Sequence, residues 1–139
     1  MKWKSDFLCG IKEIDDQHKE LIDRFADIEA IISAEHSWSD AHYAFLSLSQ
    51  FAKRHFDFEE GLMRLFALPG AEKHNKEHQH FLDKIADIQN NSIRAKVETE
   101  MIQFLYKYLQ EHILGADRKD YIDFVLSIPQ AVKSEIVPS

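Results

Sequence analysis

Four long segments of the chain carry apolar residues at the spacing of an α-helix, and this periodicity limits the possible fold more than any other feature. In the first segment Leu21, Phe25, Ile28 and Ile32 follow one another at steps of three or four residues. The chain has 4 glycines and 3 prolines among 139 residues, fewer than turn-rich β folds require. The sequence therefore predicts an all-α protein. The expected helices cover residues 16–34, 40–68, 71–90 and 93–114.

Short connections between these helices predict an antiparallel, up-down-up-down four-helix bundle in a single domain over residues 1–139. The second helix is preceded by Ser37 and Asp40, which resemble a capping box. Residues 1–14 lack the helical period, and we expect an extended arm packed along the bundle. A further apolar piece, at about 117–128, is expected to form a short C-terminal helix.

Composition excludes several classes of protein. The net charge of −7 argues against a nucleic-acid partner, which a basic patch would have to attract. No apolar run approaches the roughly 20 residues that span a membrane. Cys9 is the single cysteine, which excludes a disulfide framework and a CxxC site, and we expect it to be a small buried residue. The N-terminus lacks the apolar region of a signal peptide, so we expect a cytoplasmic location. We also expect a monomer.

Histidine is the unusual component of the sequence, because five of its 8 copies interrupt the apolar stripes. Each expected helix points at least one imidazole toward the core. The inward polar residues are His18, His55, Glu59, His74, His78 and His112, with Asp117 just past the end of the last helix. Buried imidazoles and carboxylates cost free energy unless they are compensated. A shared metal centre would compensate all of them.

The spacing of these residues fits metal ligation. His74 and His78, and likewise His55 and Glu59, are four residues apart and share one helix face, so each pair can bind one ion. Asp117 follows five residues after His112, with a glycine between them that permits a turn back toward the bundle.

Five histidines and two carboxylates are too many ligands for one ion. They fit two ions that share both carboxylates and one solvent-derived oxygen, with one position left open toward the bundle interior. Mixed nitrogen and oxygen ligation suits iron, or manganese in its place.

The order of these motifs resembles that of the hemerythrin family, in particular the single-domain bacterial hemerythrins. The matching pieces are IDDQH at 14–18, HFDFEEGLM at 55–63, HNKEH at 74–78 and HILGAD at 112–117. The resemblance extends from Trp3 to about Tyr121. It implies a protein that binds O₂ reversibly at two non-heme iron ions with an oxo or hydroxo bridge.

Residue by residue, the resemblance implies one iron on His74, His78 and His112 and another on His18 and His55. Glu59 and Asp117 would bridge the two ions. The family's O₂ pocket falls on Leu21, Phe56, Tyr108 and Leu109. Bacterial members usually have tryptophan where this chain has Tyr108.

Three other functions are compatible with parts of the pattern. A zinc hydrolase could use the HxxEH run at 74–78 with Glu77 as its base, but this leaves the other five residues unexplained. A ferritin-like oxidase needs two ExxH pairs and two further glutamates, whereas here Glu77 and His80 form the single match. A hemerythrin-fold peroxidase, or a sensor of O₂, NO or iron, would use the same seven ligands.

The remaining titratable residues near these motifs are expected on the surface. His36, His42 and His80 belong to no inward stripe, and we expect them to be solvated. Asp57 and Glu60 flank the predicted bridge and are expected to be surface charges.

Overall fold

The computed structural model of this chain describes residues 2–91 and 94–114. In this part of the chain a 3-10 turn, Ser5–Phe7, precedes four α-helices and no strand is found. The helices are α1 (Lys12–Ser33), α2 (Trp38–Leu65), α3 (Ala71–Asn91) and α4 (Arg94–Leu114). The prediction of an all-α protein is confirmed.

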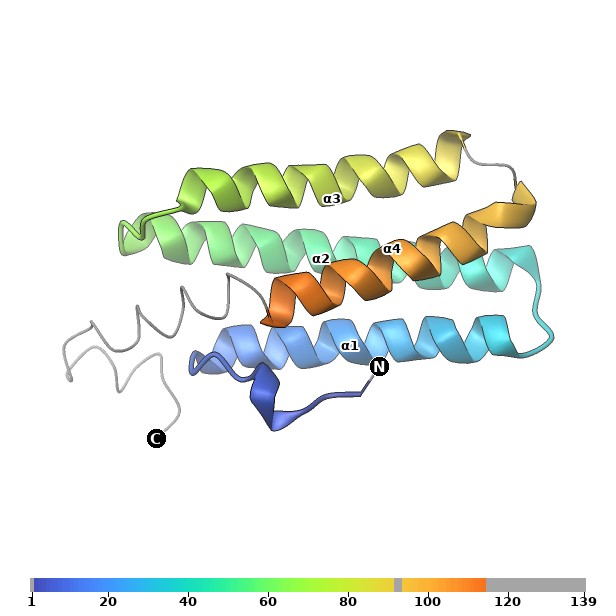
Figure 1. The fold of residues 1–139 in the computed structure, drawn as a ribbon, viewed down its shortest axis with the longest axis horizontal. Helices are drawn as coiled ribbons and strands as arrows, with labels where there is room; N and C mark the ends of the chain where they lie inside the picture. The colour runs from blue at the N-terminus through green and yellow to red at the C-terminus, as the bar shows by residue number, and fades with distance from the viewer. Residues whose placement is uncertain (1, 92–93, 115–139) are drawn as a thin grey trace.

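The four helices form an antiparallel bundle in which α1 and α3 each pack against both α2 and α4 (Figure 1). Each connection returns the chain along the neighbouring helix, as the up-down-up-down prediction required. Because the direction alternates, the start of α1, the end of α2, the start of α3 and the end of α4 meet at one end of the bundle (Figure 1). These are the four stretches that carry the inward histidines.

Two groups of buried apolar residues lie on either side of that polar level. The larger group fills the long part of the bundle and includes Phe25, Phe45 and Phe81. The smaller group consists of Cys9, Ile11, Ile14 and Met63. Burial raises the pKa of the Cys9 thiol, which therefore stays protonated and is a packing residue, as predicted.

Local signals set some helix ends, and tertiary contacts set others. The predicted capping box at α2 is present: Ser37 Oγ accepts from the Asp40 amide at 3.1 Å, and Asp40 Oδ2 accepts from the Ser37 amide at 3.4 Å. α1 begins at Lys12, four residues earlier than expected. The buried Asp15 carboxylate accepts from the backbone N–H groups of Cys9 and Gly10 at 2.8 and 3.3 Å and so holds the chain entering this helix.

The N-terminal arm packs along the bundle as predicted, although Ser5–Phe7 form a 3-10 turn within it. Phe7 is buried against the larger apolar group, and the Trp3 ring meets it edge-on at 5.3 Å between ring centres. Lys19 of α1 places its Nζ 5.2 Å from the centre of the Trp3 ring. The predicted C-terminal helix at 117–128 lies outside the described residues.

Two glycines offer a matched pair of stability tests. Gly70 has φ +88°, which an alanine side chain disfavours, so Gly70→Ala is expected to lower the free energy of unfolding by about 1–2 kcal/mol. Gly61 lies inside α2, and a Cβ added to it would have no neighbouring atom within 4 Å, so Gly61→Ala is expected to raise the free energy of unfolding by roughly 0.5–1 kcal/mol. Urea denaturation of both variants measures this difference. Equal shifts of the same sign would contradict the assigned backbone conformations.

Candidate metal centre

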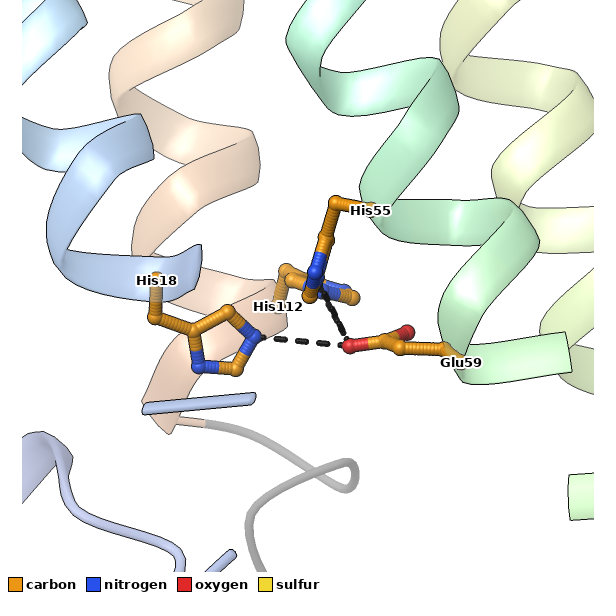
Figure 2. A group of neighbouring side chains, drawn as sticks. All are labelled: His18, His55, Glu59 and His112. Atoms are coloured by element: carbon orange, nitrogen blue, oxygen red, sulfur yellow. Dashed lines mark hydrogen bonds and ion pairs between the residues drawn. The ribbon is translucent and has the colours of Figure 1, made fainter. Parts of the chain in front are cut away.

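Glu59 occupies the middle of the polar level, and its side chain is completely buried. Its Oε1 atom faces the ε nitrogens of three histidines from three helices (Figure 2). The distances from this oxygen to Nε2 are 3.4 Å for His18, 2.8 Å for His55 and 3.3 Å for His112. The nearest ligand atoms of these four residues all lie within 4.8 Å of one another.

The second oxygen of the same carboxylate faces α3. Glu59 Oε2 lies 3.1 Å from Nε2 of His78, whose side chain is 3% exposed. Both oxygens of one buried carboxylate therefore face imidazoles, and all four helices contribute at least one of these rings. A carboxylate that is to bridge two metal ions needs this division of its two oxygens.

The remaining predicted ligands are placed as follows. His74 is buried next to His78, with 6.0 Å between ring centres, but lies outside the group of four around Glu59 Oε1. His112, which the resemblance pairs with His74 and His78, has its Nε2 on the side of His18 and His55, 3.2 Å from the Nε2 of His55. Asp117 lies outside the described residues.

The outer nitrogens of four of the five rings lie next to oxygen atoms that can accept a proton. Nδ1 lies 2.6 Å from Gln17 Oε1 in His55, 3.1 Å from the Gly70 carbonyl in His74, 3.2 Å from Glu60 Oε1 in His78 and 3.5 Å from the Tyr108 hydroxyl in His112. These contacts favour the tautomer with the proton on Nδ1, which leaves the lone pair of Nε2 directed at the centre.

Proton counting shows why such a centre fits a cation. A neutral imidazole has one N–H, yet His55 has an oxygen close to each ring nitrogen, at 2.6 and 2.8 Å. The facing ε nitrogens of His55 and His112, each without a proton in this tautomer, would bring two lone pairs together. Both ring nitrogens of His18 are buried and form no hydrogen bond within the described part of the chain. A metal ion between these atoms would bind the Nε2 lone pairs of His18, His55 and His112.

The distances between the donor atoms also suit a metal ion. Adjacent corners of a coordination sphere with bonds of about 2.1 Å lie about 3 Å apart. Glu59 Oε1 lies 2.8 to 3.4 Å from three Nε2 atoms, two of these nitrogens lie 3.2 Å apart, and the whole group lies within 4.8 Å. The type and spacing of these donor atoms therefore fit a metal ion.

Burial sets the protonation states at this centre. It lowers the pKa of His18 to about 4 and also lowers that of His55, so both rings are neutral at pH 7, as metal ligands must be. Burial alone would raise the pKa of Glu59, but His55, His112 and His18 outweigh it and hold the pKa well below its ordinary range. Glu59 is therefore an ionised carboxylate.

Comparison of the sequence with known protein families gives a match. The sequence model described as the Hemerythrin HHE cation binding domain matches residues 9–121. The chain belongs to the hemerythrin family. The match covers all four helices and every residue around Glu59, and membership indicates a metal-binding, O₂-related function with iron as the metal.

Individual relatives agree with the hemerythrin assignment. A bacteriohemerythrin from Clostridium acetobutylicum is 28% identical over 127 residues, covering 87% of this chain and 98% of its own length. A hemerythrin-like protein from Naegleria gruberi is 31% identical over 117 residues, or 84% of this chain and 87% of its own. A bacteriohemerythrin from Pseudomonas aeruginosa is 28% identical over 137 residues, or 96% of this chain and 87% of its own.

Of the four residues predicted to line an O₂ pocket, Phe56 and Tyr108 contact histidines of the cluster. Leu21, Phe56 and Leu109 are buried in the larger apolar group, and the Phe56 ring stacks on His78 at 4.0 Å between ring centres. Tyr108 is half-buried and stacks on His112 at 5.3 Å. Tyr108 and His112 also line a cavity of about 390 Å³ between α3 and α4, together with Lys73, Lys76, Glu77, His80 and Glu111.

Two expectations about surface residues are wrong. Glu60 is not a free surface charge, because its carboxylate accepts from His78 Nδ1 and its side chain is 22% exposed. His36 is tied to two partners: one ring nitrogen lies 2.8 Å from the Ala34 carbonyl, and the other lies 2.9 Å from Glu98 Oε1 on α4. These partners, the Ala34 carbonyl first, raise the pKa of His36. His42 and His80 are exposed, as predicted.

The zinc hydrolase alternative loses its proposed base. Glu77 is exposed on α3, lies 3.9 Å from Lys73, and is not part of the buried group of ligand atoms around Glu59. Separately, across residues 2–91 and 94–114 none of the helices combines the length and apolar character that crossing a bilayer requires.

Proposed function

We propose that this member of the hemerythrin family binds O₂ reversibly at a pair of iron ions bridged by carboxylates. In this proposal His74, His78 and His112 hold one ion, His18 and His55 hold the other, and Glu59 and Asp117 bridge them. The bound iron pair supplies the electrons that reversible O₂ binding uses. The observation that carries the proposal is Glu59, whose two buried oxygens face imidazoles from all four helices.

The protein's own residues would contribute orientation and exclusion of water. Gln17, the Gly70 carbonyl, Glu60 and Tyr108 accept the Nδ1 protons of four ligands and so fix which nitrogen faces the metal. Leu21 and Leu109 each lie three residues from a predicted ligand on the same helix, and Phe56 stacks on His78, so these buried residues would form an apolar wall beside the histidines. Such a wall favours a small neutral ligand such as O₂ and keeps protons from reaching it.

A peroxidase with the same ligands is the second candidate. Tyr108 favours it, because an oxidisable phenol lies 3.5 Å from Nδ1 of a metal ligand and lines a cavity. Stopped-flow measurement of O₂ release beside turnover of H₂O₂ separates the two. A carrier releases O₂ intact when the concentration of free O₂ is lowered, whereas a peroxidase consumes H₂O₂ and an electron donor at a steady rate.

The first expected result is the metal content. Protein produced with ample iron should contain two iron ions per chain, because seven predicted ligands exceed what one ion can take. Elemental analysis together with the absorption bands of an oxygen-bridged ferric pair measures this. One zinc ion and no iron under these conditions would contradict the proposal.

The second expected result concerns the apolar wall. Leu109 precedes the ligand His112 by three residues on the same helix, so Leu109→Asn would place a polar amide beside the ligand pocket. We expect the rate of O₂ release or of autoxidation to change while the iron content stays the same. Tyr108→Trp, which restores the usual bacterial residue, should slow the loss of O₂-binding capacity. If both variants release O₂ and lose O₂-binding capacity at the same rates as the wild type, Leu109 and Tyr108 do not line the pocket.

A further inference from the structure

His78 is held by α2 from three directions. Phe56 stacks on the face of its ring with an angle of 10° between the planes. Glu59 Oε2 lies 3.1 Å from Nε2, and Glu60 Oε1 lies 3.2 Å from Nδ1. Phe56 and Glu60 are one helical turn apart and so reach the same ring together. The orientation of His78 is therefore fixed by its face and by both of its nitrogens.

Glu60 is itself positioned for this contact. In the amide orientation that pairs donors with acceptors, Asn75 donates to Glu60 Oε1 and to the Ala71 carbonyl, both at 3.2 Å. Asn75 lies three residues before His78 on α3, so the two donors approach the same carboxylate oxygen from one helix. Hydrogen bonds from Asn75 and His78 of α3 thus hold the Glu60 carboxylate at the level of the proposed metal centre.

The oxygen beside the δ nitrogen of His78 carries a negative charge. Within the described residues, the δ nitrogens of His55, His74 and His112 lie beside neutral oxygen atoms, namely an amide, a backbone carbonyl and a hydroxyl. The δ nitrogen of His78 lies beside a carboxylate. An anionic acceptor draws the Nδ1 proton more strongly, which makes Nε2 a better electron donor to a metal.

We propose that Glu60 is a positioning residue that, through Nδ1 of His78, strengthens this one ligand and makes the two metal positions electronically unequal. The proposal rests on the di-iron centre proposed above. A stronger donor stabilises the more oxidised ion, so the ion held by His78 should be the easier of the two to oxidise. It should also be the more tightly held, because partners of this kind typically change metal affinity 10- to 100-fold.

Three variants separate charge, hydrogen bonding and packing. Glu60→Gln keeps an acceptor oxygen but removes the charge, and Glu60→Leu removes both. Asp57→Asn removes an equal charge from an exposed position on the same helix and serves as the control. All three are prepared as the full chain, and thermal unfolding of the metal-free proteins shows whether each one folds.

The measurements are the reduction potentials of the iron-loaded proteins, the affinity for iron by chelator competition, and the Nδ1 chemical shift of His78 in zinc-loaded, ¹⁵N-histidine protein. We expect Glu60→Gln to raise one reduction potential, to weaken one of two iron sites 10- to 100-fold, and to shift the His78 Nδ1 signal. Glu60→Leu should cause larger changes of the same kind in all three measurements. Asp57→Asn should match the wild type, since exposed charges are screened.

Failure of this inference differs from failure of the proposed function. If the wild type binds two iron ions and Glu60→Gln leaves the potentials, affinities and Nδ1 signal unchanged, the role of Glu60 is wrong while the di-iron proposal stands. Equal changes in Glu60→Gln and Asp57→Asn would also overturn it, because the effect would then be one of net charge. A wild type that binds no iron would overturn the proposed function itself.

Discussion

Glu59→Ala is expected to abolish binding of both metal ions and to destabilise the iron-loaded protein by about 4 kcal/mol or more. A metal present at roughly 1,000 times its dissociation constant contributes about that much, and the contribution disappears with the site. The physical reason is that this single carboxylate faces histidines through both oxygens, so that its removal takes a ligand from each proposed ion. Iron analysis and urea denaturation before and after treatment with a chelator measure the effect.

Chelation distinguishes loss of metal from loss of packing in this variant. After the iron is stripped, the difference in stability between wild type and Glu59→Ala should shrink, because the metal-linked part is then absent from both. Glu77→Ala is the matched control, since it removes an exposed glutamate from the HxxEH run and should retain both metal ions. Two normally bound iron ions in Glu59→Ala, or loss of metal in Glu77→Ala, would show that the bridge is assigned to the wrong carboxylate.

The parts of the fold that the sequence could predict are those in which local pattern and tertiary structure agree. Helical periodicity identifies the face that each helix buries, and alternating helix direction then brings His18, His55, His78 and His112 to one end of the bundle. The capping box at Ser37 is predictable because both of its hydrogen bonds join residues three positions apart. The contact of His112 with Tyr108 is of the same local kind, because one helical turn separates the two residues.

The contacts that sequence reasoning missed join different helices. Gln17 directly precedes a predicted ligand, yet it accepts from His55, 38 positions away. Glu60 accepts from His78, 18 positions away. Periodicity distinguishes the buried face of a helix from its exposed face. Gln17 and Glu60 lie at the border between the two faces, and their contacts depend on which neighbouring helix packs beside them. The contact of His36 with Glu98 likewise joins residues far apart in the sequence, because α4 packs beside α1.

The early start of α1 has a similar explanation. No residue near Lys12 supplies a capping side chain, so the sequence alone favoured a later start at the acidic residues. The N–H groups of Cys9 and Gly10 are instead satisfied by Asp15, which has already entered the helix. Burial of Ile11 and Ile14 in the smaller apolar group then stabilises the additional turn.

Acid is expected to remove the metal and to weaken the metal-free protein in the same pH range. Ligand histidines bind as neutral rings, so protons compete with the metal as the pH falls below about 6.5. In the metal-free protein, His18 has a folded-state pKa of about 4, below the value of about 6.5 in the unfolded chain. Between these values the unfolded chain takes up a proton that the folded chain excludes, so stability falls as the pH is lowered.

The size and the origin of this effect can both be tested. The difference of about 2.5 units for His18 corresponds to roughly 3 kcal/mol of stability lost between pH 6.5 and 4. The lowered pKa of His55 acts with the same sign, whereas the raised pKa of His36 acts with the opposite sign and contributes stability that is lost as the pH rises. Urea denaturation of metal-free protein across this pH range should show the loss of stability. His18→Leu should reduce the dependence of stability on pH, whereas His42→Gln, at an exposed position, should leave that dependence unchanged. Iron retained in full after long dialysis at pH 4, or a metal-free protein that becomes more stable on acidification, would mean that the cluster does not exclude protons and that neutral histidines do not form the metal centre.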